Sequence, residues 1–126
     1  MGFLFDGCSG LTTLDLTALD TSKVEDMQYM FSRCENLTKL DLKTFRTAKV
    51  TKMNGMFYNC KKLSSLNLKS FDTSLVRDMS FMFSGCDSLL NLDLSSFNVA
   101  NVAENSYFMA SDKLVNGHPW QEFFMS

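Results

Sequence analysis

The sequence predicts a solenoid of four stacked coils, each about 26 residues long, because one motif recurs along the chain at a fixed period. Four cysteines mark this period, at Cys8, Cys34, Cys60 and Cys86. Each follows a phenylalanine by three positions and precedes a leucine by three, and the pattern runs four times without an insertion or deletion. Self-similarity of this kind is typical of proteins in which every unit stacks on its neighbours.

A short strand is the clearest element within each unit. In the second unit, Leu40 and Leu42 alternate with the polar residues Lys39, Asp41 and Lys43. This alternation indicates a strand with one buried face, and stacked coils would align such strands in parallel. The expected strands occupy residues 13–16, 39–42, 65–68 and 91–94.

The remainder of each unit does not fit a strand, because its apolar residues recur at spacings of three or more. We expect turns and short 3₁₀ or helical pieces there, with one helical turn over residues 53–57. The two methionine columns of this region lie in register with valine and phenylalanine columns. We therefore interpret them as core filler rather than as a soft-metal site, since methionine adapts to irregular gaps.

The repeat pattern divides the chain into a solenoid at residues 1–109 and a C-terminal cap at residues 110–126. Terminal units of solenoids are atypical because they cover an open core. We expect Trp120, Phe123 and Phe124 to do so here, with an aromatic ligand platform as the alternative. The chain begins inside a repeat, so self-association through the uncapped first coil stays open as a mode of partnering.

Composition argues against several classes of function. The net charge is −2, with basic and acidic residues interspersed, so we expect no nucleic-acid partner. No apolar run approaches the length of a membrane span, and the chain carries no visible signal peptide or anchor. The sequence shows no catalytic constellation, phosphate-binding loop or metal motif, and its only histidine is His118 in the tail. We therefore expect no enzymatic activity, no cofactor and no metal.

The third unit carries a long and specific motif. Residues 56–79 read M-F-x-x-C-x-x-L-x-x-L-[DN]-L-x-x-F-[DN]-T-S-x-V-x-[DN]-M. With its equivalents over residues 1–109, this motif resembles the BspA-type leucine-rich repeat of bacterial surface proteins and lipoproteins. The resemblance implies a leucine-rich-repeat-like solenoid, a place at the cell surface or in secreted form, and binding of host or extracellular-matrix proteins.

One departure from standard leucine-rich repeats concerns the turn after the strand. Those repeats place a ladder of asparagines there, whereas this chain has Leu19, Phe45, Phe71 and Phe97. We expect aromatic packing, rather than amide hydrogen bonds, to hold this turn.

The cysteine column is interpreted as a set of buried thiols. Free cysteine is among the most buried residue types and packs as a small hydrophobe. A straight ladder of ligands does not converge on a metal, and the parallel Cβ vectors of neighbouring coils suit a disulfide poorly.

Two further columns invite a functional interpretation. Asp15, Asp41, Asn67 and Asp93 follow one another on the strand face; we expect a solvated polar face, since calcium needs six or more convergent oxygens. A variable column lies between the methionines, and we expect partial burial there. If exposed, its aromatic members would instead form a patch for a protein partner. This column consists of Tyr29, Gly55, Phe81 and Tyr107.

The function expected from these features is a protein–protein interaction module, a fragment of a bacterial surface adhesion or receptor protein. The alternative is an intracellular or self-assembling structural repeat module without an adhesion role. Outward residues at equal positions of neighbouring coils lie side by side, and this face varies between coils while the core columns barely change. The expected footprint is Lys39, Asp41, Lys43, Ser65, Asn67, Lys69 and Asp93.

Overall fold

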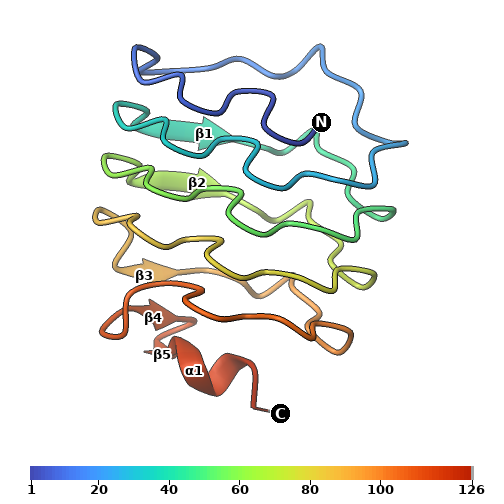
Figure 1. The fold of residues 1–126 in the computed structure, drawn as a ribbon, viewed down its shortest axis with the longest axis vertical. Coiled ribbons are helices and arrows are strands. Elements are labelled where there is room, and N and C mark those ends of the chain that lie inside the picture. The colour runs from blue at the N-terminus through green and yellow to red at the C-terminus, as the bar shows by residue number, and fades with distance from the viewer. Residues whose placement is uncertain (126) are drawn as a thin grey trace.

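Successive turns of the chain are stacked along the long axis of the molecule, and the C-terminal segment lies at one end of the stack (Figure 1). The structure is a computed structural model and describes residues 1–125. We call residues 1–26, 27–52, 53–78 and 79–104 coils 1 to 4. The elements are β1 (Lys39–Asp41), β2 (Ser65–Asn67), β3 (Asn91–Leu92), β4 (Leu114–Val115), β5 (His118–Pro119) and α1 (Trp120–Phe123).

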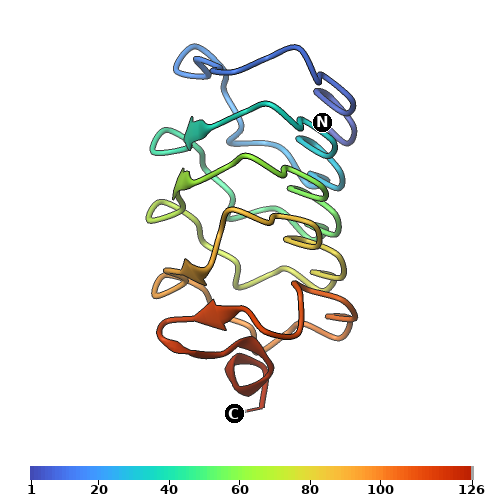
Figure 2. The same ribbon diagram turned by 90° about the vertical axis from the view of Figure 1, so that its left-hand side faces the viewer.

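The short strands pair in the register of the repeat. β1 and β2 are parallel, and Leu40 lies opposite Leu66, its equivalent in the next repeat along the chain. Strand β3 pairs in parallel with β4, and β5 returns antiparallel to β4. Residues 13–16 form no strand, and among the described residues no strand pairing joins β2 to β3. Of the expected four-stranded row, only the β1–β2 pair forms, and β3 pairs instead with β4 in the segment predicted to be the cap, so the expectation of one continuous row is wrong. Both pairs lie on the same side of the stack (Figure 2).

A second backbone ladder, which the sequence did not predict, runs through all four coils. Asp26, Lys52, Asp78 and Glu104 are joined in that order by parallel bridges. Further along each coil, the N–H of Phe31 donates to the carbonyl of Met56 (2.9 Å), and Phe57 donates in the same way to Met82 (2.9 Å). These bonds satisfy backbone groups that would otherwise be buried without a partner.

The expected helical turn over residues 53–57 is wrong; the chain makes β-turns there. The N–H of Met56 donates to the carbonyl of Met53 (3.2 Å), and Gly55 between them has φ +64°. An i to i+3 hydrogen bond with positive φ at the third residue is the pattern of a type II turn. The next turn repeats it with Asn59 at φ +58°. A right-handed helix cannot pass through residues in the left-handed region.

The core consists of columns of identical side chains. The ring of Phe57 stacks between those of Phe31 and Phe83, at centroid distances of 5.7 and 5.3 Å and interplanar angles of 5° and 9°. The six methionines of coils 2 to 4 pack beside them and are fully buried, which confirms their expected role as core filler. These methionines are Met27, Met30, Met53, Met56, Met79 and Met82.

The C-terminal segment packs against the last coil through aromatic rings. The ring of Phe124 meets Phe108 edge to face at 4.9 Å, and Trp120 lies 5.7 Å from Phe108. The indole N–H of Trp120 donates to the carbonyl of Ala110 (3.1 Å). Trp120, Phe123 and Phe124 are thus half-buried against the core. The predicted cap extends to Ser126, which lies outside the described residues.

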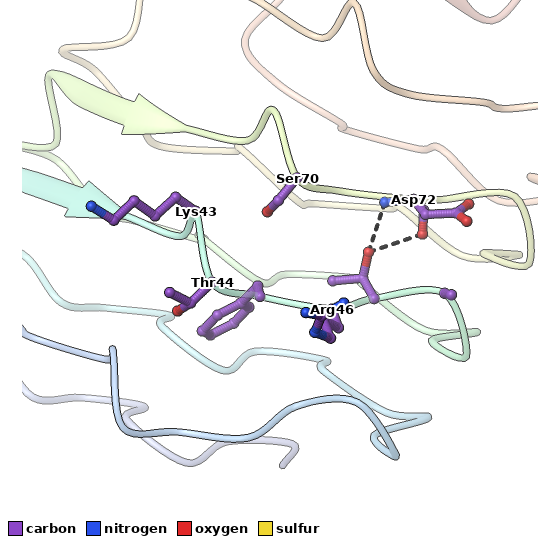
Figure 3. Close-up of a pocket in the computed structure, with 8 residues that line it drawn as sticks. Lys43, Thr44, Arg46, Ser70 and Asp72 are labelled. Atoms are coloured by element: carbon purple, nitrogen blue, oxygen red, sulfur yellow. Dashed lines mark hydrogen bonds between the residues drawn. The ribbon is translucent and has the colours of Figure 1, made fainter.

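The turn after the strand is held by aromatic stacking, as expected, and also by hydroxyl hydrogen bonds. Phe71 stacks between Phe45 (6.3 Å) and Phe97 (6.2 Å), with interplanar angles of 2°. Beside this stack, the buried hydroxyl of Thr47 donates to the carbonyl of Asp72 (2.9 Å) and accepts its N–H (2.9 Å), as Figure 3 shows.

The same double hydrogen bond joins three pairs of neighbouring coils. Thr21 bonds the backbone of Arg46, and Thr73 bonds that of Asn98, with the distances of each pair between 2.8 and 3.2 Å. Coil 4 has Val99 at this position, and the hydroxyl ladder ends there. A ladder of threonine hydroxyls, two positions after the Leu19/Phe45/Phe71/Phe97 column, thus supplies side-chain hydrogen bonds in this turn.

Replacing Thr47 with valine tests the hydroxyl ladder. Valine keeps the shape of the side chain but leaves the N–H and carbonyl of Asp72 without their partner. We expect the free energy of unfolding to fall by about 1–3 kcal/mol, the usual cost of stranding buried polar groups. Urea denaturation monitored by circular dichroism measures it.

The matched control is Thr44→Val, which removes an exposed hydroxyl three positions away. This change should stay within about 0.5 kcal/mol. Equal effects of the two substitutions would contradict a structural role for the ladder.

Candidate protein-binding surface

Most of the seven residues predicted to bind a partner lie side by side. We call this set of residues the strand face: Lys39, Asp41, Lys43, Ser65, Asn67, Lys69 and Asp93. Within β1 and β2, Lys39 lies opposite Ser65 and Asp41 opposite Asn67. Six of the seven are exposed, and Asn67 is half-buried. Asp93 follows β3, which is not paired with β2. It therefore lies at the border of the strand face, outside the β1–β2 pair.

The acidic and amide members of the strand face serve the fold. The carboxylate of Asp41 accepts the N–H of Lys43 (3.0 Å), and Asp93 accepts the N–H of Ser95 (3.0 Å). Asn67 accepts the N–H of Lys69 in the same way (3.1 Å). Such side-chain bonds to the backbone two positions further on form Asx-turns, which end each strand. This turn-forming role was not predicted from the sequence, although the repeated [DN]-L-x spacing indicates it.

The lysines of the strand face are the members left free to contact a partner. Lys43 and Lys69 occupy equal positions of coils 2 and 3. Hydrogen bonds from Thr17 lower the pKa of Asp15, and the charge of Lys43 lowers it further. Hydrogen bonds from Ser95, followed by the charge of Lys69, likewise lower the pKa of Asp93. Each ammonium thus acts on a carboxylate of the adjacent outer coil.

A shallow hollow continues the strand face toward the following turn. Its lining includes Lys43, Thr44, Arg46, Ser70 and Asp72, and Figure 3 shows Lys43 and Arg46 on either side of it. Asp72 is committed to the fold, because the Ser74 hydroxyl and N–H donate to its carboxylate and lower its pKa. Arg46 was not predicted to belong to the binding surface. Its place three positions after Lys43 on the same coil is the feature of the sequence that indicates it.

Aromatic rings form a second exposed feature, which we call the aromatic edge: Phe3, Tyr29, Tyr58, Phe81 and Tyr107. Consecutive ring centroids lie 5.2 to 6.3 Å apart. Tyr29 and Phe81 are half-buried, as expected, but the expectation is wrong for Tyr107, which is 70% exposed. Gly55 makes room for the edge, since a Cβ there would lie 2.2 Å from the ring of Tyr29. The ring of Tyr58 lies between those of Tyr29 and Phe81, where Gly55 has no side chain. The sequence did not predict this role of Tyr58.

Three of the four cysteines are buried as predicted, whereas the expectation is wrong for Cys8. Cys34, Cys60 and Cys86 are 0–2% exposed, whereas Cys8 in coil 1 is half-buried. The thiols of Cys60 and Cys86 donate to carbonyls of the preceding coil, at 3.1 and 3.0 Å. Burial raises the pKa of Cys34 to about 11 and that of Cys86 to about 12, and it raises the pKa of Cys60 as well. At neutral pH these three side chains are therefore thiols, which react slowly.

No group of three or more His, Cys, Asp or Glu side chains among residues 1–125 is placed to hold a metal ion. His118 is exposed on β5. None of the helices in the described part of the chain is long and apolar enough to cross a membrane.

Thiol labelling checks the burial of the cysteine column. In native protein at pH 8, Cys8 should react first with N-ethylmaleimide, and Cys34, Cys60 and Cys86 should react only after denaturant is added. Peptide mass spectrometry assigns each label. Rapid native labelling of Cys60, which lies between complete coils, would show that the coils do not enclose it.

The comparisons with known proteins identify a family but no function. No curated protein and no solved structure matches the chain. Residues 1–121 match a family described as "Mycoplasma protein of unknown function, DUF285", a bacterial family of repeat type. Because this match covers nearly the whole sequence, the chain belongs to the DUF285 family.

Proposed function

We propose that this chain is a leucine-rich-repeat-like solenoid of the BspA type and that it serves as a protein–protein interaction module. Two features support the solenoid. Equivalent positions of neighbouring repeats are bonded to each other in the β1–β2 pair and in the second ladder. The core columns repeat with the same register. Solenoids are chiefly binding scaffolds, because equal positions of successive coils form an extended surface.

The observation that carries the proposal is the set of free lysines on the strand face. Lys39, Lys43 and Lys69 are exposed, and none forms an ion pair with a carboxylate among the described residues. Backbone pairing holds β1 and β2 in place. A partner can therefore span coils 2 and 3 without any rearrangement of the scaffold, which lowers the entropic cost of binding.

We further propose that the protein works at the cell surface or in secreted form, as part of an adhesion or receptor protein. The resemblance of the repeats to the BspA type is the support for this proposal. The alternative is a self-assembling structural module. A hollow in coil 1 favours that alternative, because Phe5, Leu14 and Leu19 line it with apolar side chains.

Binding to purified extracellular-matrix proteins tests the proposed function. Each matrix protein is immobilised, and the chain is passed over it in a biosensor. We expect at least one saturable interaction, and the double variant Lys39→Glu/Lys69→Glu should weaken it roughly tenfold or more, since truncated or reversed charges at an interface reduce affinity.

The control variant is Lys61→Glu/Lys62→Glu, which makes the same change in net charge at exposed positions before β2. It should leave the affinity nearly unchanged. If the strand-face variant binds with the same affinity as the wild type, the binding site lies elsewhere. The next residues to replace are then Tyr29, Phe81 and Tyr107. Concentration-dependent self-association without any matrix binding would favour the structural module.

A further inference from the structure

The charges of the chain are segregated by coil, although they look interspersed in the overall composition. Residues 27–78, which form coils 2 and 3, hold ten of the twelve lysines and arginines and four acidic residues, a net charge of +6. Residues 1–26 and residues 79–126 each hold one basic and five acidic residues, a net charge of −4 on either side. A basic belt two coils wide thus lies between acidic ends.

Almost none of the belt's positive charge is neutralised internally. Among residues 1–125 the structure has one ion pair, in which Arg33 meets Asp6 with Nη2 2.7 Å from Oδ2. Lys43 and Lys69 lie at equal positions of adjacent coils, where like charges repel each other. Both side chains are exposed on the strand face; Lys43 lines the hollow together with Arg46, whereas Lys69 lines a separate hollow with Asn67 and Asp93. An anionic partner would relieve this repulsion.

We propose that the partner contributes a short, extended, acidic segment, which lies along coils 2 and 3 across Lys39, Lys43, Arg46 and Lys69. This inference rests on the proposed function and names the chemistry of the partner. Lys39, Lys43 and Arg46 lie within eight positions of coil 2, in which β1 is extended and residues 42–45 form a turn. Because the turn shortens this path, an extended peptide of at most about eight residues, at about 3.3 Å per residue, spans them. Carboxylates at alternate positions of such a peptide would face the lysines.

The geometry favours an acidic protein segment over a long polyanion. Coils stack at about 4.8 Å, so the belt is narrow, and exposed Asp15 and Asp93 flank it on the outer coils. A nucleic acid or a sulfated polysaccharide crossing the stack would meet these carboxylates.

Fluorescence anisotropy with a labelled octapeptide of glutamate and aspartate tests the proposal. A glutamine and asparagine octapeptide is the neutral probe. We expect the wild-type chain to bind the acidic peptide and not the neutral one. The affinity should fall as salt rises from about 50 mM to about 200 mM, because the contacts are ionic. Lys43→Gln/Lys69→Gln should weaken binding roughly tenfold, while Lys61→Gln/Lys62→Gln, with the same net charge, should leave it nearly unchanged.

Three results would overturn the proposal. An equal loss of peptide affinity in both double variants would show that binding depends only on the net charge of the chain. Tighter binding of a single-stranded RNA octamer or of a heparin octasaccharide would make the belt a site for those polyanions. Absence of acidic-peptide binding would refute the acidic segment, and it would leave the proposed function intact if a matrix protein still binds through the strand face.

Discussion

Each coil of this protein depends on the next coil along the chain for its hydrogen-bond partners. The strands have only two or three residues, so no strand stands alone. Instead, the N–H of Phe31 is satisfied by Met56 in coil 3, and that of Phe57 by Met82 in coil 4. Because unpaired buried backbone groups are costly, a shift of one residue in the register would break these bonds in every coil together.

The same register aligns the side chains that fill the interior. Phenylalanine meets phenylalanine at 5.3 to 5.7 Å, each threonine hydroxyl of the ladder meets the next coil's backbone, and the buried thiols bond to carbonyls of the preceding coil. Each of these contacts joins nearest neighbours only, which is the energetic hallmark of repeat architectures. The surface inherits this order, so that variable residues such as Lys39 and Ser65 lie opposite each other in fixed positions.

The buried columns of side chains were more predictable from the sequence than the backbone conformation between them. The burial of the methionines and cysteines follows from fixed spacing and hydrophobicity, and both predictions are confirmed in coils 2 to 4. The β-turns over residues 53–57 were mistaken for a helical turn. The left-handed backbone at Tyr29 and Phe81 is not indicated by these residue types; only Gly55 of that column is a residue that favours it. In the strand face, exposure of the lysines was predictable from alternation. The turn-forming role of Asp41 and Asn67 needed the local backbone, and the opening beside Arg46 needed the packing of two coils.

The candidate binding surface consists of exposed charged side chains that form no ion pair within the described residues. Asx-turns engage the carboxylates of the strand face, whereas Lys39, Lys43 and Lys69 have no ion-pair partner among the described residues. The binding proposal therefore presupposes that neighbouring coils are locked in register, since only then do these lysines form one surface.

Amide hydrogen exchange followed by nuclear magnetic resonance tests that locking most directly. The amides of Phe31 and Phe57 donate to the next coil, and that of Phe83 donates to Phe108 beyond coil 4, so they should exchange only through global unfolding and share nearly one free energy of opening. Exposed turn positions such as Lys62 and Asp87 should exchange orders of magnitude faster. If Phe57, between complete coils, exchanged as fast as Lys62, the coils would not be bonded to one another in this register.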